Sequence, residues 1–205
     1  MSSRTVVDSV TLVEAPPTDL ERLDRDLAAL RNRFPGAIID RYLGHVPCVA
    51  ERVHVAATAA LIGQVVLADD VSIWYGCVLR ADINRIEVRE RSNIQDGSIV
   101  HLGDHDGTFV GEEVVVGHRA VLHGCHIEGG CLIGIGATIL DGARIGHGSV
   151  VGAGALVTAG AAIPPHSLVL GTPAKILKTL NASDEEFHRK LALKYTRLGH
   201  NYRVG

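Results

Sequence analysis

Apolar residues recur at every sixth position over much of this 205-residue chain. The first series comprises Val53, Ala59, Val65, Val71, Cys77 and Ile83, followed after a one-residue slip by Val88, Ile94 and Val100. After a loop at 102–108, an unbroken second series comprises Phe109, Val115, Val121, Ile127, Ile133, Ile139, Ile145, Val151, Val157, Ile163 and Val169. A period of six fits neither an α-helix nor a simple alternating strand. It is typical of a repeated supersecondary unit.

Each unit reads as a short strand followed by a sharp turn. Many turn positions are glycine, which tolerates tight backbone conformations. Three units close a triangular coil of about 18 residues, and stacked coils share one column of inward aliphatic side chains. The segment 43–181 contains only Trp74, Tyr75 and Phe109 as aromatic residues, which suits a narrow core. We therefore predict an all-β solenoid, a parallel β-helix whose rungs contact only their neighbours.

Helical patterns flank the repeat. Thr18 and Glu21 have capping-box spacing, and apolar residues follow at helical spacing, so we expect a helix at about 19–33 that ends before Pro35. Ser183 and Glu186 predict the start of a second helix. Its apolar face would consist of Phe187, Leu191, Tyr195 and Leu198. The predicted domains are an N-terminal extension at 1–40, a β-helix at 41–175 and a C-terminal helix within 176–205 that packs on the β-helix.

Composition excludes several classes of function. A formal net charge of −3 without any Lys/Arg run argues against a nucleic-acid partner or an anionic membrane surface. No stretch approaches the roughly 18–20 apolar residues of a membrane span. Residues 1–17 lack the pattern of a secretory signal. The four cysteines form no CxxC motif, so we expect reduced, buried thiols and a cytoplasmic location.

Two histidines are expected on one side of the solenoid. His101 follows the predicted inward Val100 by one residue, and His123 follows Val121 by two. Their separation of 22 residues, less about three for the loop at 102–108, is close to one coil. Adjacent rungs lie about 4.8 Å apart, near enough for two imidazoles to share a metal.

His118 is expected elsewhere, because it lies five residues before His123 and therefore on or near a different face. Two ligands on one face and one on another predict a site between subunits, which a cyclic trimer would repeat three times. Three histidines with an open position are typical of a catalytic Zn²⁺ site. Zn²⁺ is the expected cofactor, and imidazoles suit Fe²⁺ and Co²⁺ as well.

Three segments together resemble the gamma-class carbonic anhydrase family, most closely its short-loop bacterial and plant-mitochondrial-like members. They read SIWYGCVLRAD at 72–82, RSNIQDGSIVH at 91–101 and GHRAVLHGC at 117–125. The similarity covers roughly 35–198. It implies a left-handed β-helix, a homotrimer, and metal-dependent, reversible hydration of CO₂ to bicarbonate.

The resemblance also implies roles for individual residues. It makes His101 and His123 metal ligands from one subunit and His118 a ligand from the next.

A polar set around the metal follows from the same resemblance. Gln95 is similar to the residue that hydrogen-bonds the metal-bound water. Arg80 and Asp82 resemble an ion pair across the trimer interface, Asp96 belongs to the same polar cluster, and Asn93 is expected in the pocket. An interface salt bridge without a chemical role is the alternative for Arg80, Asp82 and Asp96.

The chain departs from the family pattern at two places. The loop at 102–108 is short where the best-known member carries a long acidic loop with a glutamate proton shuttle, and Ile83 replaces a second expected glutamate. We hypothesise that His105, Asp104 or Asp106 serves as the shuttle, because imidazoles exchange protons near neutral pH.

Other functions share this fold. A hexapeptide acyl- or acetyltransferase is one alternative, since 171–175 (GTPAK) resembles a closing motif of that class. A weakly active metal-binding assembly subunit and a thioesterase-like hydrolase are the others. The histidine set favours the metal site over a transferase, in which one histidine acts as a base without metal.

Overall fold

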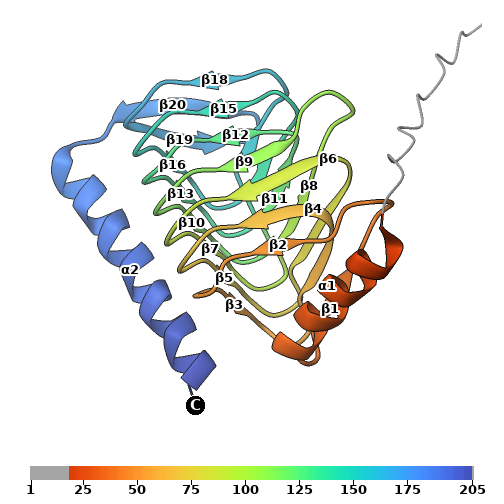
Figure 1. Cartoon of the computed structure of the whole chain (residues 1–205). Helices are drawn as coiled ribbons and strands as arrows, with labels where there is room; N and C mark the ends of the chain where they lie inside the picture. The colour runs from red at the N-terminus through yellow and green to blue at the C-terminus, as the bar shows by residue number, and fades with distance from the viewer. Residues whose placement is uncertain (1–18, 205) are drawn as a thin grey trace, which may run out of the picture.

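The computed structural model describes residues 19–204, which form a left-handed parallel β-helix with two flanking helices. Helix α1 (Leu20–Arg33) lies at the N-terminal end of the solenoid, and α2 (Ala182–Val204) runs along one side of it (Figure 1). The predicted fold class is therefore confirmed. Neither helix of the described residues is long and apolar enough to cross a membrane.

The first face of the solenoid is an eight-stranded sheet. Its strands are β3 (His54–Val55), β5 (Ser72–Ile73), β7 (Asn93–Ile94), β10 (Val115–Val116), β13 (Leu132–Ile133), β16 (Val150–Val151), β19 (Ser167–Gly171) and β20 (Ala174–Thr179). All pairs are parallel except the last, in which β20 folds back antiparallel on β19.

The other two faces belong to one 12-stranded sheet, because β4 (Ala60–Leu67) and β6 (Val78–Val88) each bend from one face to the next. The second face adds β1 (Ile38–Asp40), β8 (Ile99–His101), β11 (Val121–His123), β14 (Thr138–Ile139) and β17 (Leu156–Val157). The third adds β2 (Cys48–Val49), β9 (Thr108–Val110), β12 (His126–Ile127), β15 (Arg144–Ile145) and β18 (Ala162–Ile163).

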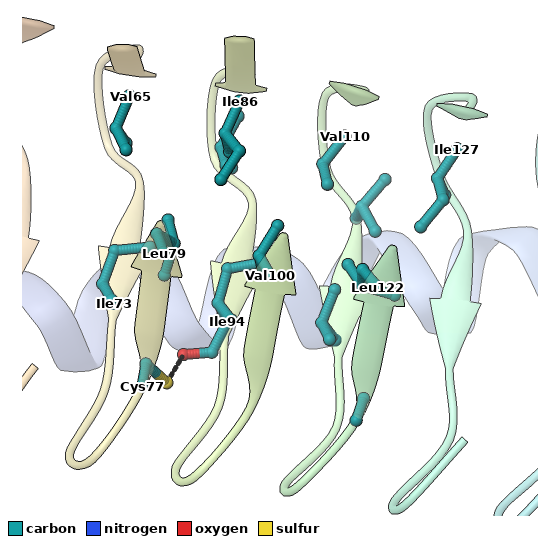
Figure 2. Packing of buried hydrophobic residues seen from close by; sticks show 14 of the residues in the cluster. Val65, Ile73, Cys77, Leu79, Ile86, Ile94, Val100, Val110, Leu122 and Ile127 are labelled. Carbon is teal, nitrogen blue, oxygen red and sulfur yellow. Dashed lines mark hydrogen bonds between the residues drawn. The ribbon is translucent and has the colours of Figure 1, made fainter. Parts of the chain in front are cut away.

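The core consists of stacked columns of small aliphatic side chains. Figure 2 shows one column that contains Leu79, Val100 and Leu122, and all three are fully buried. The Cys77 thiol donates to the carbonyl oxygen of Ile94 on the next rung at 3.3 Å (Figure 2). Identical rungs placed one above another bury these columns without large aromatic rings.

Four predicted inward positions are wrong. Ile83 is 47% exposed because the corner of β6 carries it outward, and Ile86 fills the core instead. Phe109, Val115 and Val121 also point outward, since the inward residues of their strands are Val110, Val116 and Leu122.

The physical reason is a second register slip. The inward residues Leu122 and Ile127 are five apart. A strict period of six counted back from Ile127 therefore predicts Val121 as inward, one residue before the observed Leu122.

The helix starts also differ from prediction. The Asp19 side chain accepts from the Arg22 N–H and caps α1, whereas Thr18 lies outside the described residues. At α2 the Asn181 side chain accepts from the N–H groups of Ser183 and Asp184, and the Asp184 carboxylate accepts from the Asn181 N–H. This reciprocal box lies two residues before the predicted one, because an asparagine caps as well as a serine.

Helix α2 packs on the first face through small and aromatic residues. Trp74 of the solenoid contacts Tyr195 and Tyr202 of the helix edge-on, with ring centroids 6.0 and 5.4 Å apart. A Cβ at Gly199 would lie 3.1 Å from the Ser72 Cβ, so glycine permits this close approach. Phe187 was expected on the packed face but is 62% exposed.

Candidate metal centre

His101 and His123 lie side by side at one edge of the second face. They end β8 and β11, and the strand register pairs them directly. Nδ1 of His101 is 3.1 Å from Nε2 of His123, and the ring centroids are 5.1 Å apart. This confirms that the two histidines share one side of the solenoid on adjacent rungs.

A carboxylate holds the other nitrogen of each ring. Nε2 of His101 is 3.3 Å from Oδ1 of Asp82, which also pairs with Arg80 of the same chain. Nδ1 of His123 is 2.7 Å from Oδ1 of Asp141. Metal-ligating histidines usually have this second contact, which fixes the tautomer and ring orientation.

The electrostatics favour an unprotonated His101. Burial lowers the pKa of His101 below its ordinary value, and the Arg80 guanidinium and His123 lower it further. At neutral pH His101 is therefore neutral. A neutral imidazole offers a lone pair to a cation, which is the state that metal binding requires.

The spacing of the facing nitrogens fits a metal ion. Two nitrogens bound to a tetrahedral Zn²⁺ lie about 3.3 Å apart, close to the observed 3.1 Å. Within residues 19–204, no three His, Cys, Asp or Glu side chains gather closely enough to hold a metal. One described chain therefore supplies at most part of a three-histidine site.

The pair opens onto a hollow of about 420 Å³. Its walls are Ile83, His101, Leu102, Gly103, Asp104, His105, Asp106, His123 and Asp141. The three proposed shuttle residues thus line the same hollow as the histidine pair. Those three are exposed at its rim, so they connect the pair with bulk water.

The remaining predicted residues lie at the corner between the first and second faces. His118 precedes β11, whereas His123 ends it, and Nδ1 of His118 is 3.0 Å from Oδ2 of Asp96. The buried Gln95 donates through Nε2 to Oδ1 of the buried Asn93 at 3.1 Å. The structure thus divides the predicted residues of one chain into two separate clusters.

The sequence reasoning missed Asp141 as a site residue, and it considered Tyr195 only for helix packing. Asp141 lies 18 residues after His123, which is one coil, so repeat spacing alone could have identified it. Tyr195 comes from α2, where burial and then the charge of Asp96 raise the pKa of its hydroxyl. Nothing local in the sequence marks a helix residue as a neighbour of the second cluster.

The chain is similar to several known proteins. Residues 124–159 match the family model described as bacterial transferase hexapeptide (six repeats). A "Probable carbonic anhydrase" of Methanocaldococcus jannaschii is 45% identical over 150 residues, 73% of this chain and 94% of that protein. The mitochondrial gamma carbonic anhydrase 1 of Arabidopsis thaliana is 41% identical over 158 residues, 74% of this chain and 58% of that protein. The solved structure of a hexapeptide transferase family protein from Anaplasma phagocytophilum aligns with a TM-score of 0.77 and 36% identity, covering 80% of this chain and 98% of that one.

Proposed function

Since the chain belongs to the gamma carbonic anhydrase family, we propose that it catalyses the reversible hydration of CO₂ to bicarbonate at metal centres between the subunits of a homotrimer. The proposed ligands are His101 and His123 of one subunit and His118 of the partner subunit. Zn²⁺ is the proposed metal, and Fe²⁺ and Co²⁺ suit the same ligands.

One observation carries the proposal. Two imidazole nitrogens face each other at 3.1 Å while carboxylates hold the outer nitrogens of both rings. Two neutral imidazoles gain little from direct contact, because each ring has only one N–H to donate. A cation between the facing lone pairs explains why both outer nitrogens are occupied and both inner ones converge.

The surface of the second face supports the trimer. Its outward side chains next to the histidine pair include Val78, Ile99 and Val121, and Ile99 is 38% exposed. Exposed Tyr75 and Ile83 extend this apolar surface towards its two edges. Exposed apolar side chains gathered on one face favour its burial against another copy of the chain.

A threefold axis would join the two clusters of site residues. In a cyclic trimer, one edge of each face meets the opposite edge of the next face. The cluster of His118, Asp96 and Gln95 would then approach the pair of His101 and His123 in the neighbour. Each interface would hold one complete site, and the trimer would hold three.

The chemistry that Zn²⁺ supplies in such a site is a lower pKa for water, which provides a nucleophile at neutral pH. The protein's own groups hold and orient the ligands. Asp82 accepts from the Nε2–H of His101, and Arg80 neutralises part of the charge of Asp82. Because Nε2 of Gln95 donates to Asn93, its carbonyl oxygen remains to accept a hydrogen bond from water.

Proton release would use the loop at 102–107. Its His105, Asp104 and Asp106 stand at the rim of the hollow that contains the histidine pair. Hydration of CO₂ releases one proton for each bicarbonate formed, and this proton must reach solvent buffer before the next turnover. We propose that the His105 imidazole accepts it within the hollow.

A transferase remains the alternative function, and the Anaplasma structure favours it by name. A transferase that uses one histidine as a base requires no convergent pair, so the facing nitrogens favour the metal site. The weakly active assembly subunit and the thioesterase-like hydrolase would both keep the metal, and the measured activity separates them from a carbonic anhydrase.

The test is one preparation measured three ways. The full chain is purified anaerobically and examined for metal content, solution mass and CO₂ hydration. We expect about one metal per chain, a mass of three times 21.8 kDa, and hydration that a chelator abolishes and added metal restores. A metal-free monomer would contradict the proposal.

A further inference from the structure

The contact between Asp141 and His123 points to a further role in the centre. We propose that Asp141 is a positioning residue that keeps the proton of His123 on Nδ1, aims Nε2 at the metal position and thereby tightens metal binding. This inference rests on the proposed function only in requiring that the histidine pair binds a metal.

The first step is the tautomer. Oδ1 of Asp141 lies 2.7 Å from Nδ1 of His123, and an ionised carboxylate can only accept a hydrogen bond. The single N–H of the neutral imidazole is therefore on Nδ1. The lone pair is then on Nε2, the nitrogen that faces His101 at 3.1 Å.

The second step is the space that holds the Asp141 carboxylate. A Cβ at Gly103 or at Gly124 would lie only 2.4 Å from Oδ1 of Asp141. These glycines belong to the turns that follow β8 and β11, and the Gly124 N–H donates to the His101 carbonyl at 3.2 Å. The two turns leave a space between neighbouring rungs that the carboxylate fills.

The third step is the charge. Among residues 19–204, the one basic side chain within 4.0 Å of the Asp141 carboxylate is that of His123, whereas Asp82 also pairs with Arg80. The charge of Asp141 therefore acts most directly on the His123 ring. A carboxylate in this position fixes the orientation of the ring and strengthens it as a metal ligand.

The test measures zinc affinity by competition with a chelator, on intact metal-free protein. Asp141→Ala should weaken zinc binding by about 10- to 100-fold. Asp141→Asn should fall between this variant and the wild type, because its amide oxygen can accept the same hydrogen bond without the charge. Glu128→Gln is the charge-matched control, since Glu128 is an exposed carboxylate of the solenoid that accepts from the His147 N–H and does not line the hollow, and its zinc affinity should stay within about twofold.

A second variant tests the space around the carboxylate without changing Asp141. Gly103→Ala places a methyl group against the carboxylate and should weaken zinc binding in the same direction. Gly129→Ala is its matched control, because a Cβ there would lie 2.6 Å from the Glu112 carboxylate, away from the histidine pair. The double variant Gly103→Ala/Asp141→Ala should bind zinc about as well as Asp141→Ala alone.

Two different failures can be told apart. Unchanged zinc affinity in both Asp141→Ala and Gly103→Ala, while His123→Ala abolishes binding, overturns the role of Asp141 and leaves the proposed function intact. Wild-type protein that binds no zinc overturns the proposed function and this inference together. If Asp141→Ala does not fold, the affinity of Gly103→Ala decides the matter.

Discussion

Nδ1 of His101 faces Nε2 of His123 at 3.1 Å across two rungs of the solenoid. The β-helix produces this approach directly, because parallel register places equivalent side chains of adjacent rungs at the spacing between strands. The carboxylates of Asp82 and Asp141 hold the far side of each ring. Both histidines are thus oriented before any metal binds.

Removal of one member of the pair should abolish stoichiometric metal. His101→Ala leaves a single ligand in this cluster, and we expect zinc content to fall from about one per chain to a trace. His126→Ala is the control, because His126 also points outward from a rung but stacks on Phe109 at 4.5 Å. Full zinc content in His101→Ala, measured by atomic emission, would contradict the assignment.

Proton release should depend on the loop at 102–107. His105→Ala should lower CO₂ hydration about 10-fold in weak buffer, and imidazole buffer should restore the rate. Zinc content should not change. Stopped-flow measurements across a buffer series test this, and an unaltered rate with unaltered buffer dependence would exclude His105 as the shuttle.

Acid should destabilise the docking of α2 through His54. Burial, and then the Arg203 guanidinium, lower the pKa of His54 in the folded protein. Below the unfolded value of about 6.5, the unfolded chain binds the proton more readily than the folded one, so stability falls as pH falls. The contribution of this group is at most about 1.4 kcal/mol per pH unit.

His54→Phe keeps a ring beside Trp74, whose centroid is 5.1 Å away, and removes the titration. Its midpoint of thermal unfolding should therefore fall less between pH 7 and pH 5 than that of the wild type. The exposed His45 provides the control, and His45→Phe should retain the wild-type slope. Equal slopes in all three proteins would rule out His54 as the cause.

The thiol of Cys48 should react faster than those of Cys77, Cys125 and Cys131. All four are free, and Cys48 alone is exposed, which corrects the expectation of four buried thiols. Burial raises the pKa of Cys77 to about 11 and those of Cys125 and Cys131 to about 12. Thiolates are the reactive form, so one thiol per native chain should react with a maleimide at pH 8, and four after unfolding. Rapid native labelling of Cys48→Ser would contradict this.

The sequence was sufficient to predict the β-helix and the approach of His101 to His123, because both follow from one repeat length. It was less reliable in predicting which of two neighbouring strand residues faces the core. A strict period of six placed Phe109 and Val121 in the core, and the five-residue step from Leu122 to Ile127 moved both outside. A single-residue change in repeat length occurs in a turn, and turn residues carry no inward apolar side chain that would reveal the change in the sequence.

Contacts between distant segments were harder to predict. Repeat spacing places Asp141 one coil after His123 and so beside it, but no motif marks it as a site residue. Tyr195 approaches the cluster of Asp96 and His118 only because α2 lies on the first face, a position that depends on the packing of Trp74 with the helix. Helical periodicity alone cannot specify such a docking position.

The central claim is that each site takes ligands from two subunits, and mixed trimers test it most directly. His118→Ala and His123→Ala subunits, each inactive alone, are coexpressed with different tags and purified through both. In every trimer that carries both tags, an intact His101/His123 cluster meets an intact His118 at one of the three interfaces. Zinc and CO₂ hydration should return in that proportion, whereas mixtures of His101→Ala and His123→Ala should regain neither. Mixed trimers of the first kind without zinc would contradict a shared site.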